Sequence, residues 1–216
     1  MPDFAAARER MIERQIAGRG ITDPRILAAF RNVPRELFVA EADRAAAYDD
    51  GPLPIAADQT VSQPYIVALM IDAARIGPGD HILEVGAGSG YAAAVIGRIA
   101  GSVVAVERHR TLADQAAARM ETLGYDHVRV LHGDGMEGVP AAAPFDAILI
   151  AAAGPEVPGP LLAQLRPGGV LVMPLGAQDE VQQLVRILRR ADGGLDREEL
   201  GAVRFVPLLP GLPGSR

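Results

Sequence analysis

The chain has 216 residues, of which 49% are hydrophobic, and this length suits one domain, residues 1–216, with a substantial core. Its formal net charge of −6 argues against a broad nucleic-acid-binding surface, and the absence of Cys excludes disulfides, thiolate metal sites and a cysteine nucleophile. No apolar run is long enough to span a bilayer and the N-terminus has no signal-peptide core, so we expect a cytoplasmic protein that does not bind membranes.

The first part of the chain, residues 1–60, predicts a helical extension. An apolar stripe at helical spacing runs from Phe4 to Ile16 and is followed by two glycines. The sequence Thr-Asp-Pro at 22–24 then predicts the cap and first turn of a second helix, which runs through Phe30.

Residues 62–190 have a different pattern, typical of an α/β core. A helix is expected after Ser62, with Pro64 in its first turn and Gly77 at its end. Further helices are expected at 89–100, 109–123 and 158–166, alternating with apolar strands at 81–86, 102–107, 128–133, 145–151 and 168–175. Nearly continuous apolar strands separated by helices indicate a parallel sheet covered on both faces.

The C-terminal part, residues 191–216, is expected to supply a last strand and a tail. The sequences VQQLVRILRR and AVRFVPL resemble two strands around a turn at Gly193 and Gly194. The predicted fold class is therefore α/β, a doubly wound, mostly parallel, Rossmann-like sheet with an N-terminal helical extension.

The strongest local signal is the glycine-rich segment HILEVGAGSGY. Gly86, Gly88 and Gly90 follow the first core strand, where glycine lets backbone N–H groups approach a ligand closely. Tyr91 replaces the last Gly or Ala of a dinucleotide fingerprint, and no Gly-Lys-Ser/Thr of a P-loop follows. With Glu84 two residues before it, the G-x-G-x-G spacing resembles that of class I S-adenosylmethionine-dependent methyltransferases. The expected cofactor-binding residues here are Glu84, Gly86, Ala87, Gly88, Ser89 and Gly90.

Acidic residues after the next two strands extend this cofactor hypothesis. Glu107 ends the second core strand and can accept hydrogen bonds from ribose hydroxyls, or it is simply a solvated carboxylate. After the third strand, Asp134 can accept from an adenine amino group and Gly135 lets the backbone pass close to the ring. The alternative for that pair is an ordinary Asp-Gly turn.

From about residue 11 to 209 the chain resembles protein-L-isoaspartate O-methyltransferase. The resemblance is carried by GITDPRILAAFRNVPRELFV, AYDDGPLPIAADQTVSQPYIVALM, ILEVGAGSGY, GDG, APFDAILIAAAGPEVPGPLLAQLRPGGVLVMPLG and VRFVPL, in this order. It implies that S-adenosyl-L-methionine methylates the free α-carboxylate of L-isoaspartyl residues in damaged proteins and peptides, leaving S-adenosyl-L-homocysteine. The ester then closes to a succinimide that partly hydrolyses to normal Asp. We expect the enzyme to act as a monomer.

The block QTVSQPY is the part that generic methyltransferases lack. A carboxylate is ionised at neutral pH and a sulfonium methyl is already activated, so the reaction needs positioning rather than a strong base. The resemblance therefore implies a catalytic role for Ser62, whose hydroxyl holds the substrate carboxylate or orders the loop over the methyl group. Gln59, Thr60 and Val61 would line the cofactor beside it. The alternative is that Ser62 only caps the helix that begins at Gln63.

The resemblance also implies that VRFVPL binds the substrate peptide. Its residues Val203, Arg204, Phe205 and Val206 would pair with the peptide through the main chain, whereas the alternative is a plain edge strand. The four His residues are scattered without ligand spacing, so no metal site is predicted.

Three other functions remain open from the sequence. A nucleic-acid methyltransferase is disfavoured, because the fourth strand leads into AAAGPEVPG without an Asp/Asn-Pro-Pro-aromatic loop and the chain is acidic. A methyltransferase for a small-molecule carboxylate or one dedicated peptide shares the cofactor motifs, as does a non-catalytic cofactor-binding homologue.

Overall fold

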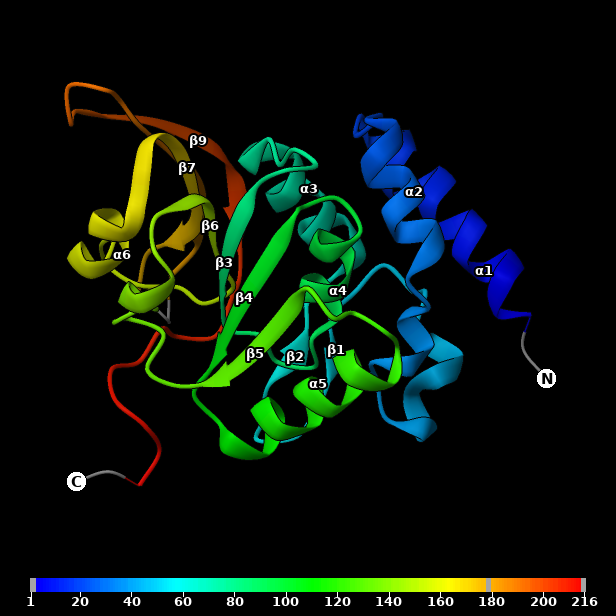
Figure 1. The fold of residues 1–216 in the computed structure, drawn as a ribbon. Coiled ribbons are helices and arrows are strands. Elements are labelled where there is room, and N and C mark those ends of the chain that lie inside the picture. The colour runs from blue at the N-terminus through cyan, green and yellow to red at the C-terminus, as the bar shows by residue number, and fades with distance from the viewer. Residues whose placement is uncertain (1–2, 178–179, 215–216) are drawn as a thin grey trace.

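The computed structural model describes residues 3–177 and 180–214, which fold around one seven-stranded sheet (Figure 1). The strand order is β5-β4-β3-β6-β7-β8-β9. β3 to β7 run parallel, and β8 and β9 join antiparallel at one edge. The strands are β3 His81–Val85, β4 Ser102–Glu107, β5 Val128–His132, β6 Phe145–Ile150, β7 Leu165–Leu175, β8 Gln182–Arg189 and β9 Leu195–Val203.

Helices cover both faces of this sheet, and alternate strand residues face opposite cores. Ile82 packs into the core that contains α3 and α4, whereas its neighbour Leu83 packs into the core that contains Leu161 of α6. The helices are α1 Phe4–Met11, α2 Pro24–Asn32, α3 Pro64–Ala74, α4 Tyr91–Gly97, α5 Arg110–Thr122 and α6 Gly159–Gln164. The predicted doubly wound α/β class is confirmed, since burial on both faces is what the apolar strands require.

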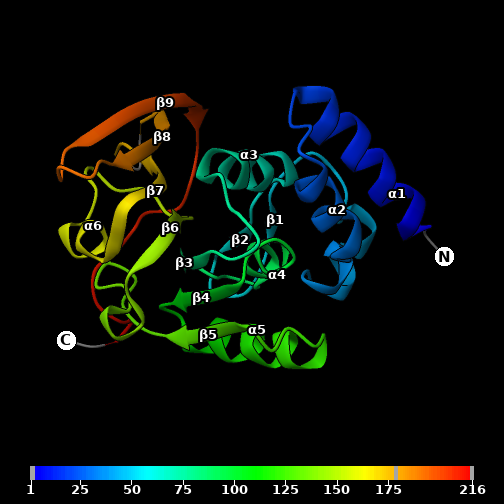
Figure 2. The ribbon, with the colours of Figure 1, turned by 45° about the horizontal axis from the view of Figure 1, so that its top comes forward.

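The N-terminal extension packs outside α3 and α4 (Figure 2). The Asp23 side chain accepts a hydrogen bond from the backbone N–H of Arg25, so the predicted cap of α2 is confirmed. After α1 the chain continues as a π-helical segment and several 3-10 turns at Ile12–Ile16, Ala17–Arg19, Arg35–Leu37 and Glu41–Ala46. A small antiparallel ribbon of β1 (Leu53–Pro54) and β2 (Thr60–Val61) then leads into α3.

Several predicted boundaries are wrong. β7 begins at Leu165, where a helix to residue 166 was expected, and the β1–β2 ribbon begins at Leu53, inside the helical extension expected to reach residue 60. The helix after Ser62 ends at Ala74 rather than Gly77, because Arg75 takes a left-handed conformation and the Gly77 N–H donates to Asp80. The last strand is Leu195–Val203 rather than AVRFVPL. The chain leaves the sheet after Val203, so the plain edge-strand alternative for VRFVPL is also wrong.

Candidate functional site

A cavity of about 820 Å³ lies at the carboxyl ends of the central parallel strands. β3 is flanked there by β4 on one side and β6 on the other, where the winding of the sheet reverses, and ligands of open α/β sheets bind at this point. Three walls come from distant parts of the sequence: the stretch before α3 (59–63), the glycine loop after β3 (86–89) and the segment after β9 (203–209).

Glu107 ties the glycine loop to the end of β4. One carboxylate oxygen accepts from the Gly88 N–H at 2.9 Å and the other accepts from the His109 N–H at 2.9 Å. Gly88 has a φ of 53° and Gly86 a φ of 90°, and glycine adopts this left-handed region without strain. Since each carboxylate oxygen can accept a second hydrogen bond, Glu107 still has lone pairs for a ligand in the cavity.

The predicted glycine-loop residues differ in their placement. Glu84, Gly86, Ala87, Gly88 and Ser89 line the cavity together with Glu107. Gly90 does not line it. It precedes α4 with a φ of 85° and packs against α5, where a Cβ would lie 3.0 Å from the Met120 methyl carbon and 3.3 Å from the Ala116 Cβ.

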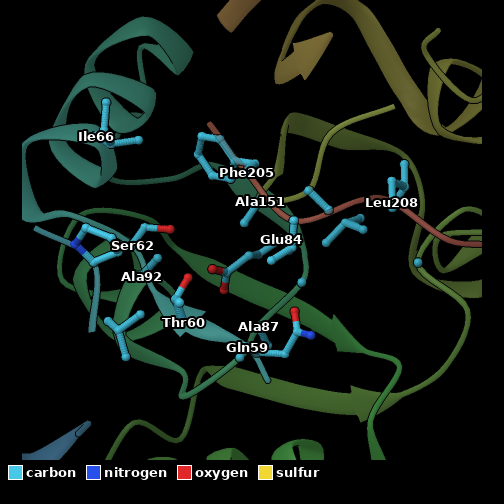
Figure 3. A pocket seen from close by; sticks show the side chains of 18 of the residues that line it. Gln59, Thr60, Ser62, Ile66, Glu84, Ala87, Ala92, Ala151, Phe205 and Leu208 are labelled. Carbon is cyan, nitrogen blue, oxygen red and sulfur yellow. The ribbon is translucent and has the colours of Figure 1, made fainter. Parts of the chain in front are cut away.

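Glu84 is a buried acid inside the cavity. It is 2% exposed, and its Oε2 has no hydrogen-bond partner among the described residues. Burial, and then the charge of Glu107, raise the pKa of Glu84 to about 8. In Figure 3 its carboxylate points toward the side of the cavity that holds Ser62 and Thr60.

Ser62 lies where the main cavity meets a smaller one of about 30 Å³. Both cavities are lined by Ser62 and Glu84, and the smaller one has otherwise apolar walls. The N-cap residue of α3 is Gln63, which makes no side-chain cap hydrogen bond. The alternative that Ser62 serves as the helix cap is therefore wrong, and its hydroxyl lines the cavity instead (Figure 3). Gln59, Thr60 and Val61 line the cavity beside it, as their predicted role requires.

Asp134 and Gly135 are adjacent in sequence, but they differ in their relation to the cavity. Gly135 lines the cavity and Asp134 does not. The Asp134 carboxylate accepts from the Met136 N–H at 2.9 Å and from the Gly211 N–H at 2.6 Å, so it anchors the C-terminal tail. Its contact with adenine stays a prediction.

The segment Val203–Val206 lines the cavity. Its main-chain pairing with the substrate peptide stays a prediction, and the Phe205 N–H already donates to the Gln182 side chain. The ring of Phe205 faces the cavity opposite the Ser62 hydroxyl (Figure 3). The sequence interpretation missed Arg108, His109, Ala151, Ala152, Leu208 and Leu209, which line it too. The first four directly follow β4 and β6, so the rule that ligands bind beyond the carboxyl ends of parallel strands would have found them.

In the described residues no three or more His, Cys, Asp or Glu side chains gather into a possible metal site. The same part of the chain contains no helix long and apolar enough to cross a membrane.

Comparison with known proteins places this geometry in a family. The family model described as Protein-L-isoaspartate(D-aspartate) O-methyltransferase matches residues 6–212. A protein-L-isoaspartate O-methyltransferase of Rhodopseudomonas palustris (strain ATCC BAA-98 / CGA009) is 60% identical over 92% of this chain and 91% of its own length. A protein of the same name from Brucella anthropi is 50% identical over 97% of this chain and 96% of its own length.

Solved structures agree with the sequence relatives. A protein-L-isoaspartate O-methyltransferase matches with a TM-score of 0.82 at 30% identity, over 93% of this chain and 65% of that one. A putative enzyme of this kind from Plasmodium falciparum, in complex with S-adenosyl-L-homocysteine, has the same fold, with a TM-score of 0.81 at 24% identity over 97% of this chain and 99% of that one. The chain therefore belongs to the protein-L-isoaspartate(D-aspartate) O-methyltransferase family.

Proposed function

We propose a division of roles within the cavity by which the chain carries out its family's reaction. That reaction transfers a methyl group from S-adenosyl-L-methionine to the free α-carboxylate of an L-isoaspartyl residue in a damaged protein or peptide. The cavity offers a cofactor end, at the glycine loop and Glu107, and an acceptor end, at Ser62 and Phe205.

The cofactor end supplies groups that match a positively charged nucleoside. Glu107 is held by the Gly88 and His109 N–H groups and accepts the ribose hydroxyls with its remaining lone pairs. The buried carboxyl of Glu84 lines the same cavity, and the positive charges of a bound cofactor would favour its ionised form. A bound cofactor would therefore compensate the Glu84 oxygen that has no hydrogen-bond partner among the described residues.

The acceptor end positions the carboxylate that receives the methyl group. The Ser62 hydroxyl would donate a hydrogen bond to this carboxylate and hold it toward the cofactor end of the cavity. No proton has to be removed, because the acceptor is already an anion at neutral pH. The observation that carries the proposal is the shared cavity, in which Ser62 and Glu84 lie between the glycine loop and the Phe205 segment.

The test is transfer of labelled methyl from S-adenosyl-L-methionine to a short isoaspartyl peptide, beside the same peptide with normal aspartate. We expect base-labile label on the isoaspartyl peptide alone. Label on both peptides, or on neither while calorimetry shows cofactor binding, would contradict the proposal and direct the search to other carboxylates.

The proposal also includes the setting in which the enzyme works. We propose a monomer in the cytoplasm that acts on damaged proteins in general, without nucleic acid or membrane partners. A molar mass of about 23 kDa by light scattering supports the monomer, given the 22.7 kDa of the chain. Twice that mass at micromolar concentration would contradict it.

A further inference from the structure

The side chain of Gln182 holds the Phe205 wall of the cavity from behind. Gln182 begins β8 and is fully buried. Its side-chain oxygen accepts from the Phe205 N–H at 2.6 Å, and its side-chain nitrogen donates to the Phe205 carbonyl at 3.1 Å. A neighbouring strand would make the same two hydrogen bonds with Phe205, so the glutamine amide takes the place of a strand here.

The Gln182 side chain takes the place of a strand at the point where the pairing of β8 with β9 ends. The backbone of Gln182 pairs with Val203, the last residue of β9, and the chain then turns away from β8. Two residues later, the Gln182 side chain contacts Phe205. On the other side of the segment, the Ala153 N–H donates to the Val206 carbonyl at 2.8 Å. Phe205 is thus fixed between β8 and the loop after β6.

We propose that Gln182 is a positioning residue for the isoaspartyl peptide: it fixes Phe205 opposite Ser62 and thereby sets the affinity for the peptide. This inference rests on the proposed function of the cavity. Removing the amide leaves the Phe205 N–H and carbonyl without partners, and polar backbone groups in that condition drive a rearrangement. The cofactor end at Glu107 is held by separate hydrogen bonds, so its affinity should change little.

Gln164 provides a matched control. It is also a buried glutamine, and its amide binds three backbone groups: the Val139 N–H at 2.7 Å, the Glu137 carbonyl at 2.8 Å and the Pro160 carbonyl at 3.0 Å. It does not line the cavity. Gln164→Leu therefore removes hydrogen bonds of the same kind from another part of the same fold.

The experiment compares Gln182→Leu with Gln164→Leu in the methyl-transfer assay, with cofactor Kd measured by calorimetry. Loss of the two bonds to Phe205 should raise KM for the isoaspartyl peptide about tenfold or more, with kcat and cofactor Kd within about twofold of wild type. The Gln164 variant should lower the melting temperature similarly and leave the peptide KM unchanged.

A second variant, Gln182→Glu, distinguishes positioning from folding. A protonated glutamic acid can both accept from the Phe205 N–H and donate to its carbonyl, whereas the ionised form can only accept. The peptide KM of this variant should therefore approach that of wild type as pH falls and rise as the new carboxyl ionises. This variant decides the question if Gln182→Leu does not fold.

An unchanged peptide KM in the Gln182 variants, or an equal rise in Gln164→Leu, would overturn the inference. The outcome also separates it from the proposed function. If wild type methylates the isoaspartyl peptide and the Gln182 variants behave like the control, only the inference fails. If wild type does not methylate the peptide, the proposed function fails.

Discussion

Ser62 lies at the acceptor end of the cavity, and its hydroxyl is free of the capping role that its place before α3 suggested. We predict that Ser62→Ala lowers kcat roughly 10- to 100-fold, the effect of removing one hydrogen bond to a charged group. Cofactor Kd should stay within about twofold, because the glycine loop and Glu107 are untouched. Ser102→Ala is the control, since Ser102 contacts His81 and does not line the cavity. Equal turnover in wild type and Ser62→Ala would contradict the catalytic role.

Glu84 makes the stability of the cofactor-free protein depend on pH. Its pKa is about 8 in the folded protein against an ordinary 4.5, so the folded state holds the proton more tightly than the unfolded state. Stability from this group is complete below the ordinary value and falls as pH rises toward 8, by at most ~1.4 kcal/mol per pH unit.

Glu84→Gln isolates this effect, because the amide cannot ionise. Urea unfolding of both proteins from about pH 5 to about pH 9 should show the wild type losing stability relative to the variant. The same pH trend in both proteins would mean that Glu84 does not carry the effect.

Local sequence pattern predicts where the buried strands lie, but it does not predict the contacts between distant segments. It correctly predicts runs such as Ser102–Glu107, because an apolar run between turn residues specifies a buried strand. It does not predict the strand end at Val203, because the hydrogen-bond partner of Phe205 is a side chain from β8, far away in the sequence. The hydrogen bonds of Glu107 with Gly88 and of Asp134 with Gly211 are not predictable from local pattern either, because they form only when distant segments of the folded chain meet.

Gly90, at the start of α4, combines a positive φ with close packing against α5. Gly90→Ala should cost about 1–3 kcal/mol of unfolding free energy, since the residue has a positive φ and the new methyl meets Met120 and Ala116. Gly124→Ala is the matched control, because Gly124 has a φ of 71° and open space around a Cβ. Chemical denaturation should show a larger loss for Gly90→Ala, and equal losses would mean that packing against α5 contributes nothing.

In the molecule as a whole, the N-terminal extension supports the glycine loop. Phe38, 1% exposed, packs edge-on against Tyr91 at the start of α4, with ring centroids 5.5 Å apart. It also lies beneath the guanidinium of Arg119, which donates to the Ser89 carbonyl at 2.6 Å. The extension and the cofactor end of the cavity are therefore one packed unit.

This packing predicts a long-range effect of Phe38→Ala. Loss of the ring should cost about 3–5 kcal/mol of stability and weaken cofactor binding several-fold, because both supports of the glycine loop lose a contact. Phe4→Ala, on the outer helix beside Tyr48, should leave cofactor Kd unchanged. Calorimetry on both variants below their melting temperatures tests this, and equal cofactor Kd values would disprove the coupling.

The cavity is completed late in synthesis, because one of its three walls lies near the C-terminal end of the chain. Translation proceeds from the N-terminus, so the wall at 203–209 leaves the ribosome after the extension, the glycine loop and Ser62. A nascent chain that has already built the parallel strands still lacks Phe205 and the tail that Asp134 anchors. A chain that stops before residue 203 therefore has an incomplete cavity, which lacks the wall that we propose for the substrate peptide.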